Sequence, residues 1–227
     1  MCTNHHFDNY FMVIFAQNKV VLLMKDKFLT FAMKSIKEYH PDYNDIKLAE
    51  LKYNLEGFYL SFTKLIIIIA LSLFLDVFKE MVIMLIVFNI LRSTGFGLHA
   101  TKSWICLLSS SIVFLCCPLL AKIISIPFNL KILLGIGSIL LIYKYAPADT
   151  KKRPLIKKEK RDKYKFKTTI KCIILVIASL IIKDSTISNL FIFGIWNEVF
   201  MILPITYKIF NLSYNNYKTY ILENNLG

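Results

Sequence analysis

A histidine and a cysteine, His99 and Cys106, stand seven residues apart between two strongly apolar segments of the chain. A thiol close to an imidazole is typical of a cysteine nucleophile and its general base. Cys106 would lie near the start of a helix, where the helix macrodipole favours the thiolate. The pair is therefore the first candidate for catalysis. The alternative is an interfacial histidine and a packing thiol.

The spacing of this pair requires a break in the helix. On one continuous helix the two side chains would share a face but stand about 10 Å apart along the axis, too far for a direct hydrogen bond. Gly95 and Gly97 flank Phe96 just upstream, and glycine permits a sharp turn. We predict that the helix breaks here and that His99 folds back over a helix that begins near Ser103.

The composition indicates an integral membrane protein. Of 227 residues, 56% are hydrophobic, and the mean hydropathy is +0.54. The chain therefore has more apolar side chains than the core of a soluble protein of this length needs. The formal net charge of +13 does not point to nucleic acid, because no groove-reading module is recognisable. The basic residues lie in loops between apolar segments, which favours cytoplasmic anchoring and contact with anionic lipid.

Six apolar segments are candidates for membrane spans, namely 58–78, 80–97, 103–121, 130–146, 169–183 and 187–207. Several are shorter than the roughly 20 residues that cross a bilayer comfortably, and the second is the weakest. Six spans place most lysines and arginines on one side, as expected for the cytoplasm. The few on the opposite side are Lys79, Lys122, Lys131 and Lys183. We predict six transmembrane helices, both termini in the cytoplasm, and the His99–Cys106 pair near the cytoplasmic face.

The other segments complete a predicted division of the chain. Residues 1–23 lack the features of a secretory signal and form an N-terminal extension that is either disordered or lies on the membrane; Met24 is an alternative start. Residues 24–57 mix apolar and charged side chains, which predicts cytoplasmic amphipathic helices at the inner interface. The six-span domain would comprise 58–207, and residues 208–227 a cytoplasmic C-terminal tail. The fold class is thus an all-α integral membrane protein.

The five cysteines form no metal-type pair and no disulfide framework. We expect no metal and no cofactor. Cys116, Cys117 and Cys172 are expected to be buried, inert packing residues.

No third catalytic residue is obvious, and two carboxylates have open roles. Glu198 lies inside the last span, where a carboxylate is costly, so that it either makes a structural hydrogen bond or handles substrate. Asp149 belongs to a basic loop and is either a solvated carboxylate or a group that orients His99.

Two stretches resemble the signatures of a known family. Arg92…Gly97-Leu98-His99-Ala100…Cys106 resembles the signature of the accessory gene regulator B (AgrB) membrane peptidases, and Ala146-Pro-Ala-Asp-Thr-Lys-Lys-Arg-Pro154 resembles the loop signature after their fourth span. The likeness extends from about Met24 to the C-terminus. One departure is Phe96, which takes the first of two places where the family usually has adjacent glycines.

The resemblance implies a cysteine endopeptidase of the bacterial cell membrane. Such an enzyme cuts the C-terminal region from a quorum-sensing precursor peptide of the AgrD type and permits thiolactone cyclisation, with Cys106 as the nucleophile and His99 as its base. Gly97, Arg92 and Glu198 are predicted to contact the substrate. Alternatives are a non-catalytic membrane scaffold and a peptide transporter. A homodimer is compatible with the short spans.

The loop from Lys144 to Lys171 holds 12 basic residues. Topological anchoring alone could explain them. The resemblance implies a second role, because the excised end of the precursor is typically acidic. Lys151, Lys152 and Arg153 are the predicted docking residues.

Overall fold

The protein is described by a computed structural model that covers residues 25–98, 109–150 and 154–223. Within these ranges the chain is helical and contains no strand, which confirms the all-α fold. An isolated parallel bridge joins Phe96 to Ala148. The chain forms two compact units, Met1–Ala70 and Leu71–Gly227, and each is considered by itself.

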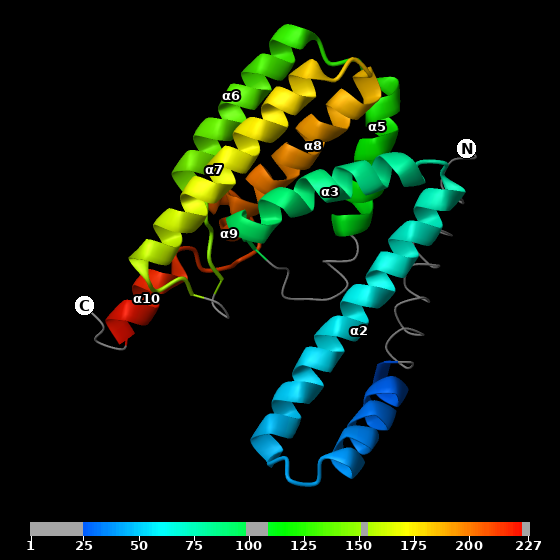
Figure 1. The fold of residues 1–227 in the computed structure, drawn as a ribbon, viewed down its shortest axis with the longest axis vertical. Helices are drawn as coiled ribbons and strands as arrows, with labels where there is room; N and C mark the ends of the chain where they lie inside the picture. Colours follow the sequence, from blue (N-terminus) through cyan, green and yellow to red (C-terminus); the bar gives the residue numbers. More distant parts are fainter. Residues whose placement is uncertain (1–24, 99–108, 151–153, 224–227) are drawn as a thin grey trace, which may run out of the picture. The chain divides into compact units, whose positions relative to one another are not determined.

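The first unit is a helical hairpin. A helix over residues 25–39 is followed by a short turn and by α2, Asp45–Phe74 (Figure 1). The Lys25 ammonium lies 2.7 Å from the Glu56 carboxylate and joins the two helices; this hydrogen bond raises the pKa of Lys25. Several large apolar side chains of the hairpin are exposed, among them Phe31, Phe58 and Phe62. The hairpin thus combines lysines with exposed aromatic side chains, and its place at the inner membrane interface stays a prediction.

The second unit is a bundle around one central helix. Its elements are α3 (Phe78–Gly95), a helix Ser109–Ile123 that contains the π-helical turn Ile112–Cys116 and α5 (Cys117–Ile123), α6 (Phe128–Tyr145), α7 (Lys158–Ile181), α8 (Ser185–Ile202), α9 (Pro204–Ile209) and α10 (Asn216–Glu223). In Figure 1, α6, α7 and α8 lie side by side, and α3 runs across α8 and reaches α7. α8 packs against α3, α5, α6 and α7, which is why residues on nearly all sides of α8, polar ones included, are buried.

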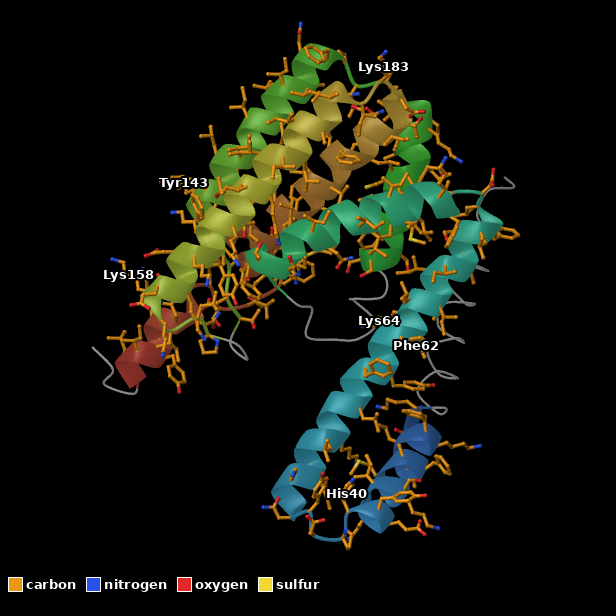
Figure 2. The ribbon with its side chains drawn as sticks, in the orientation of Figure 1. His40, Phe62, Lys64, Tyr143, Lys158 and Lys183 are labelled. Carbon is orange, nitrogen blue, oxygen red and sulfur yellow. The ribbon has the colours of Figure 1, made fainter. Side chains whose placement is uncertain are left out.

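Three helices of the described residues are long and apolar enough to cross a membrane: Leu55–Phe74, Phe128–Tyr145 and Ser185–Ile202. The helix Ser109–Ile123 is apolar but shorter. A helix overlaps each of the six predicted spans. Because only three of the helices in the described residues have the length and hydropathy of a membrane span, six crossings stay a prediction. The first half of α7 is strongly basic, and Figure 2 shows Lys158 and Lys183 near opposite ends of the bundle. The apolar part of α7 is therefore its second half.

Polar side chains join the helices at the end of the bundle where α6 and α8 begin. The buried Lys131 ammonium donates to the Ser188 hydroxyl at 2.7 Å, and this hydroxyl donates to the Ser179 carbonyl at 2.6 Å. The Asn189 amide donates to the Ile124 carbonyl at 2.6 Å. Buried polar groups require such partners, and these bonds link α6, α7 and α8. The candidate site lies beyond the other ends of α6 and α8.

Candidate functional site

The predicted helix break is present where it was expected. α3 ends at Gly95, and Phe96 follows with a φ of +59°. Gly97 has a φ of +100°, a region that L side chains rarely adopt and glycine adopts readily. The chain therefore turns sharply at Phe96 and Gly97, directly before His99.

Two glycines at this turn allow a close approach of the backbone to α8. A Cβ at Gly95 would lie 2.5 Å from the Glu198 carboxylate oxygen, and a Cβ at Gly97 would lie 2.7 Å from the Met201 carbonyl oxygen. A Cβ at Gly95 would force the Glu198 side chain to shift, whereas a Cβ at Gly97 would meet backbone, which cannot move as easily. Packing thus requires glycine most strictly at Gly97, and its positive φ adds a second reason.

Main-chain hydrogen bonds hold the turn from both sides. The Gly97 N–H donates to the Ala148 carbonyl at 2.8 Å, and the Ala148 N–H donates to the Gly95 carbonyl at 3.0 Å. The Leu98 N–H donates to the Met201 carbonyl at the end of α8, at 3.0 Å. The residue that precedes His99 is therefore fixed to α8, and the turn is fixed to the loop after α6.

Arg92 holds the same turn through its side chain. Its guanidinium donates to the carbonyls of Phe96, Gly97 (3.3 Å) and Leu98 (2.7 Å). These carbonyls follow the C-terminus of α3, where a cation is favoured by the helix dipole. Because one rigid fork satisfies three carbonyls, Arg92 fixes the shape of the turn. This geometry favours a positioning use of Arg92 over direct substrate contact.

The Arg92 guanidinium also lies 3.8 Å from the Glu198 carboxylate. The Glu198 side chain is fully buried in α8, whereas that of Arg92 keeps 16% of its exposure. Neither carboxylate oxygen of Glu198 accepts a hydrogen bond from the described part of the chain. Within these residues the polar contact of Glu198 is the pair with Arg92 between α3 and α8, and both roles considered for Glu198 stay predictions.

The ring of Phe96 points to α7. It meets the Tyr164 ring edge to face, with the centroids 5.0 Å apart, a favourable aromatic geometry. This contact gives Phe96 a packing role that glycine cannot fill.

Asp149 differs from the solvated carboxylate that its basic surroundings suggested. It is 3% exposed, and its carboxylate accepts the N–H groups of Asn216 (2.9 Å) and Tyr217 (2.7 Å) at the start of α10. Unpaired N–H groups at a helix N-terminus attract carboxylates. The Asp149 carbonyl accepts the Tyr207 hydroxyl at 3.0 Å. The loop after α6 is thus joined to the C-terminal segment.

Residues 208–227, predicted only as a C-terminal tail, contain α10 (Asn216–Glu223). A signal was available, because Asn215 and Asn216 precede apolar residues at helical spacing. Burial raises the pKa of Tyr214, in the same segment, to about 12. Its phenol stays neutral and lies 3.5 Å from the Tyr145 carbonyl at the end of α6.

Three predicted site residues, Arg92, Gly97 and Glu198, come together at the turn. The others lie outside the described residues: His99, Cys106, Lys151, Lys152 and Arg153. No group of three or more metal-binding side chains gathers in the ranges the structure describes. Cys172 is buried as expected, but Cys116 is exposed on its helix, so that the burial expected for Cys116 was wrong.

Comparison with known proteins identifies the family. The family model described as Accessory gene regulator B matches residues 30–202. An AgrB-like protein of Clostridium acetobutylicum is 36% identical over 180 residues, which cover 78% of this chain and 85% of that protein. An AgrB-like protein of Listeria monocytogenes is 35% identical over 173 residues, 75% of this chain and 84% of that protein.

A more distant relative is the protein FsrB of Enterococcus faecalis, which is 28% identical over 180 residues, 78% of this chain and 74% of that protein. No solved structure matches the chain. The residues that the family model matches include α3, the turn with Arg92 and Gly97, and Glu198 in α8. The chain therefore belongs to the accessory gene regulator B family, which implies a membrane protein that takes part in peptide processing in the agr quorum-sensing system.

Proposed function

We propose that this protein is a membrane-embedded cysteine endopeptidase that removes the C-terminal region of a quorum-sensing precursor peptide. Cys106 is the nucleophile and His99 is its general base. The observation that carries the proposal is the turn at Phe96–Leu98 in a chain of this family. Its hydrogen bonds to Ala148 and Met201 hold the backbone directly before His99, and a fixed base is what nucleophilic catalysis requires.

The first step is acyl transfer to the thiol. His99 takes the thiol proton, and the Cys106 sulfur attacks the carbonyl carbon of the scissile peptide bond. The tetrahedral intermediate collapses when the bond from carbon to nitrogen breaks and His99 returns the proton to the leaving nitrogen. The C-terminal piece departs with a free amine, and the N-terminal piece stays bound to Cys106 as a thioester.

The second step is exchange of one thioester for another. A cysteine thiol within the bound piece loses its proton to His99 and attacks the thioester carbonyl, and Cys106 leaves as a thiolate that takes the proton back. The product is a thiolactone ring of similar bond energy. Cyclisation competes with hydrolysis, so that exclusion of water at the membrane boundary favours the ring.

The basic loop is the proposed docking surface for an acidic precursor end. Lys151, Lys152 and Arg153 form its centre, and the exposed Lys157 and Lys158 at the start of α7 continue it. Opposite charges raise the association rate and orient the peptide.

Arg161 serves the protein itself rather than the precursor. It donates to the carbonyls of Leu155 (2.7 Å) and Ile156 (2.6 Å) and stacks on the Tyr217 ring at 4.0 Å. Neutralising Arg161 would therefore disturb the loop and is a poor test of docking.

The test uses the full chain in phospholipid nanodiscs and a cysteine-containing precursor peptide with an acidic C-terminal end. Cys106→Ala should abolish cleavage, and mass spectrometry of wild-type protein should show a precursor fragment attached to Cys106. Cys116→Ala is the matched control, since Cys116 is an exposed cysteine of the helix Ser109–Ile123, and this variant should cleave as wild type. Full cleavage by Cys106→Ala would remove Cys106 as the nucleophile, whereas the absence of cleavage by the wild-type protein would leave a scaffold or a transporter.

A further inference from the structure

Among the described residues, the hydrogen bonds between the C-terminal segment and the loop after α6 converge on Asp149. The carboxylate accepts the N–H groups of Asn216 and Tyr217 at the start of α10, at 2.9 and 2.7 Å. It also lies 3.4 Å from the Leu155 N–H. Its carbonyl accepts the Tyr207 hydroxyl at 3.0 Å. Asp149 is therefore held through its side chain by α10 and through its backbone by α9.

The residue before Asp149 holds the turn that leads to His99. Ala148 exchanges hydrogen bonds with Gly95 and Gly97, at 3.0 and 2.8 Å. Since Ala148 and Asp149 are adjacent, the bonds that fix Asp149 also limit the movement of Ala148. Figure 1 shows α10 beside the start of α7, far along the chain from α3. A series of bonds thus connects α10 to Gly97: the hydrogen bonds to Asp149, the peptide bond between Asp149 and Ala148, and the hydrogen bond from Gly97 to Ala148.

The segment that completes this series lies beyond the residues that the family model matches. The family model ends at residue 202, and Tyr207, Asn216 and Tyr217 all follow it. Tyr207 is 1% exposed, and its ring meets the Tyr214 ring edge to face at 5.1 Å. A solvated tail would bury neither a tyrosine nor a carboxylate.

We propose that Asp149 is a positioning residue, which ties the C-terminal segment after residue 203 to the loop after α6 and so fixes the turn before His99. The inference rests on the proposed peptidase function. Asp149 touches no reacting atom in this role. Its effect reaches the chemistry through Ala148 and Gly97, and it should act on the rate of the chemical step rather than on precursor binding, because the docking residues lie after it in the loop.

A small displacement of the turn is enough to change the rate of the chemical step. A misplacement of about 1 Å far from the chemistry can lower a rate by roughly a hundredfold. Asp149→Asn keeps the side-chain volume but turns one acceptor oxygen into a donor, which then faces an N–H group of α10. The start of α10 should separate from the loop, and the turn should lose its support on that side.

The experiment measures kcat and KM for precursor cleavage, per folded protein, in nanodiscs. Asp149→Asn should lower kcat about tenfold or more and leave KM within about twofold. Tyr207→Phe removes one bond to the Asp149 carbonyl and should lower kcat less, by about two- to fivefold. Asp162→Asn is the control for lost charge, since Asp162 is exposed in the same basic region; its kinetics should match wild type.

Each outcome decides the proposal. A lower thermal midpoint with a wild-type kcat per folded protein would show that Asp149 only stabilises the fold and would overturn it. If Asp149→Asn does not fold, the kcat of Tyr207→Phe decides in the same way. Cys106→Ala is measured in parallel. Cleavage without Cys106 removes the proposed cysteine mechanism itself. If cleavage depends on Cys106 but Asp149→Asn and Tyr207→Phe both show wild-type kinetics, only the role of Asp149 is removed.

Discussion

The Arg92 guanidinium lies 3.8 Å from the Glu198 carboxylate and joins the end of α3 to α8 inside the bundle. The same guanidinium donates to Gly97 and Leu98 carbonyls. Glu198 therefore has an indirect role at the turn, since it limits where the Arg92 side chain can lie.

Glu198→Gln should destabilise the protein. Removing one partner of a buried ion pair costs about 3–5 kcal/mol, and we expect about 1–3 kcal/mol here because Arg92 is partly exposed and retains its carbonyl acceptors. Thermal unfolding in detergent measures this loss. Glu80→Gln is the control, because the Glu80–Lys122 pair at 3.3 Å is more exposed and should contribute under about 1 kcal/mol. Equal losses in both variants would contradict the importance of burial.

Phe96→Gly and Phe96→Ala separate backbone strain from ring packing. Both variants lose the contact with Tyr164, but only glycine relieves the positive φ of +59°, which costs an L-residue roughly 1–2 kcal/mol. The glycine variant should therefore be the more stable of the two by about 1 kcal/mol. Chemical denaturation of the two proteins measures the difference, and a more stable alanine variant would show that residue 96 is not held at positive φ.

Gly97→Ala should lower precursor cleavage by about tenfold or more, because the new Cβ would displace the Met201 carbonyl and the turn before His99. Its distance to that oxygen would be 2.7 Å. Gly137→Ala is the matched control in α6, where a Cβ would lie 3.8 Å from Trp196, an ordinary contact. This control should keep full activity and gain about 0.5–1 kcal/mol from helix propensity. Wild-type cleavage by Gly97→Ala would mean that the turn tolerates displacement.

Neutralising the basic loop should weaken precursor binding. With three glutamines in place of Lys151, Lys152 and Arg153, KM should rise while kcat changes little, and the dependence of KM on salt should become flatter. A second variant removes the same charge elsewhere, at Lys27, Lys34 and Lys37 of the first unit, which are exposed. It should bind precursor as wild type. If both variants raise KM equally, overall charge and not the loop governs binding.

Apolar runs predicted the helices well because burial of a long apolar stretch is a strong local signal. The run 130–146 corresponds to α6, Phe128–Tyr145. The run 169–183 begins eleven residues after α7 does, because the first half of α7 is helical but basic. Hydropathy marks the part of a helix that is apolar, and it does not mark where the helix begins.

The site was predicted in part. The break at Gly95 and the importance of Gly97 follow from the glycine pattern, which is local. The burial of Asp149 does not follow from its neighbours in sequence, which are basic, because its partners Asn216 and Tyr217 are more than 60 residues away. Likewise Cys116 lies in an apolar segment, yet which face of a helix is exposed depends on the packing of the other helices.

The parallel bridge between Phe96 and Ala148 also has an evolutionary consequence. Two loops that lie far apart in the sequence share one register, so that an insertion in either would shift the hydrogen bonds of the other. Among relatives, these loops should keep a constant length, and the residues in the places of Phe96 and Ala148 should vary together rather than independently.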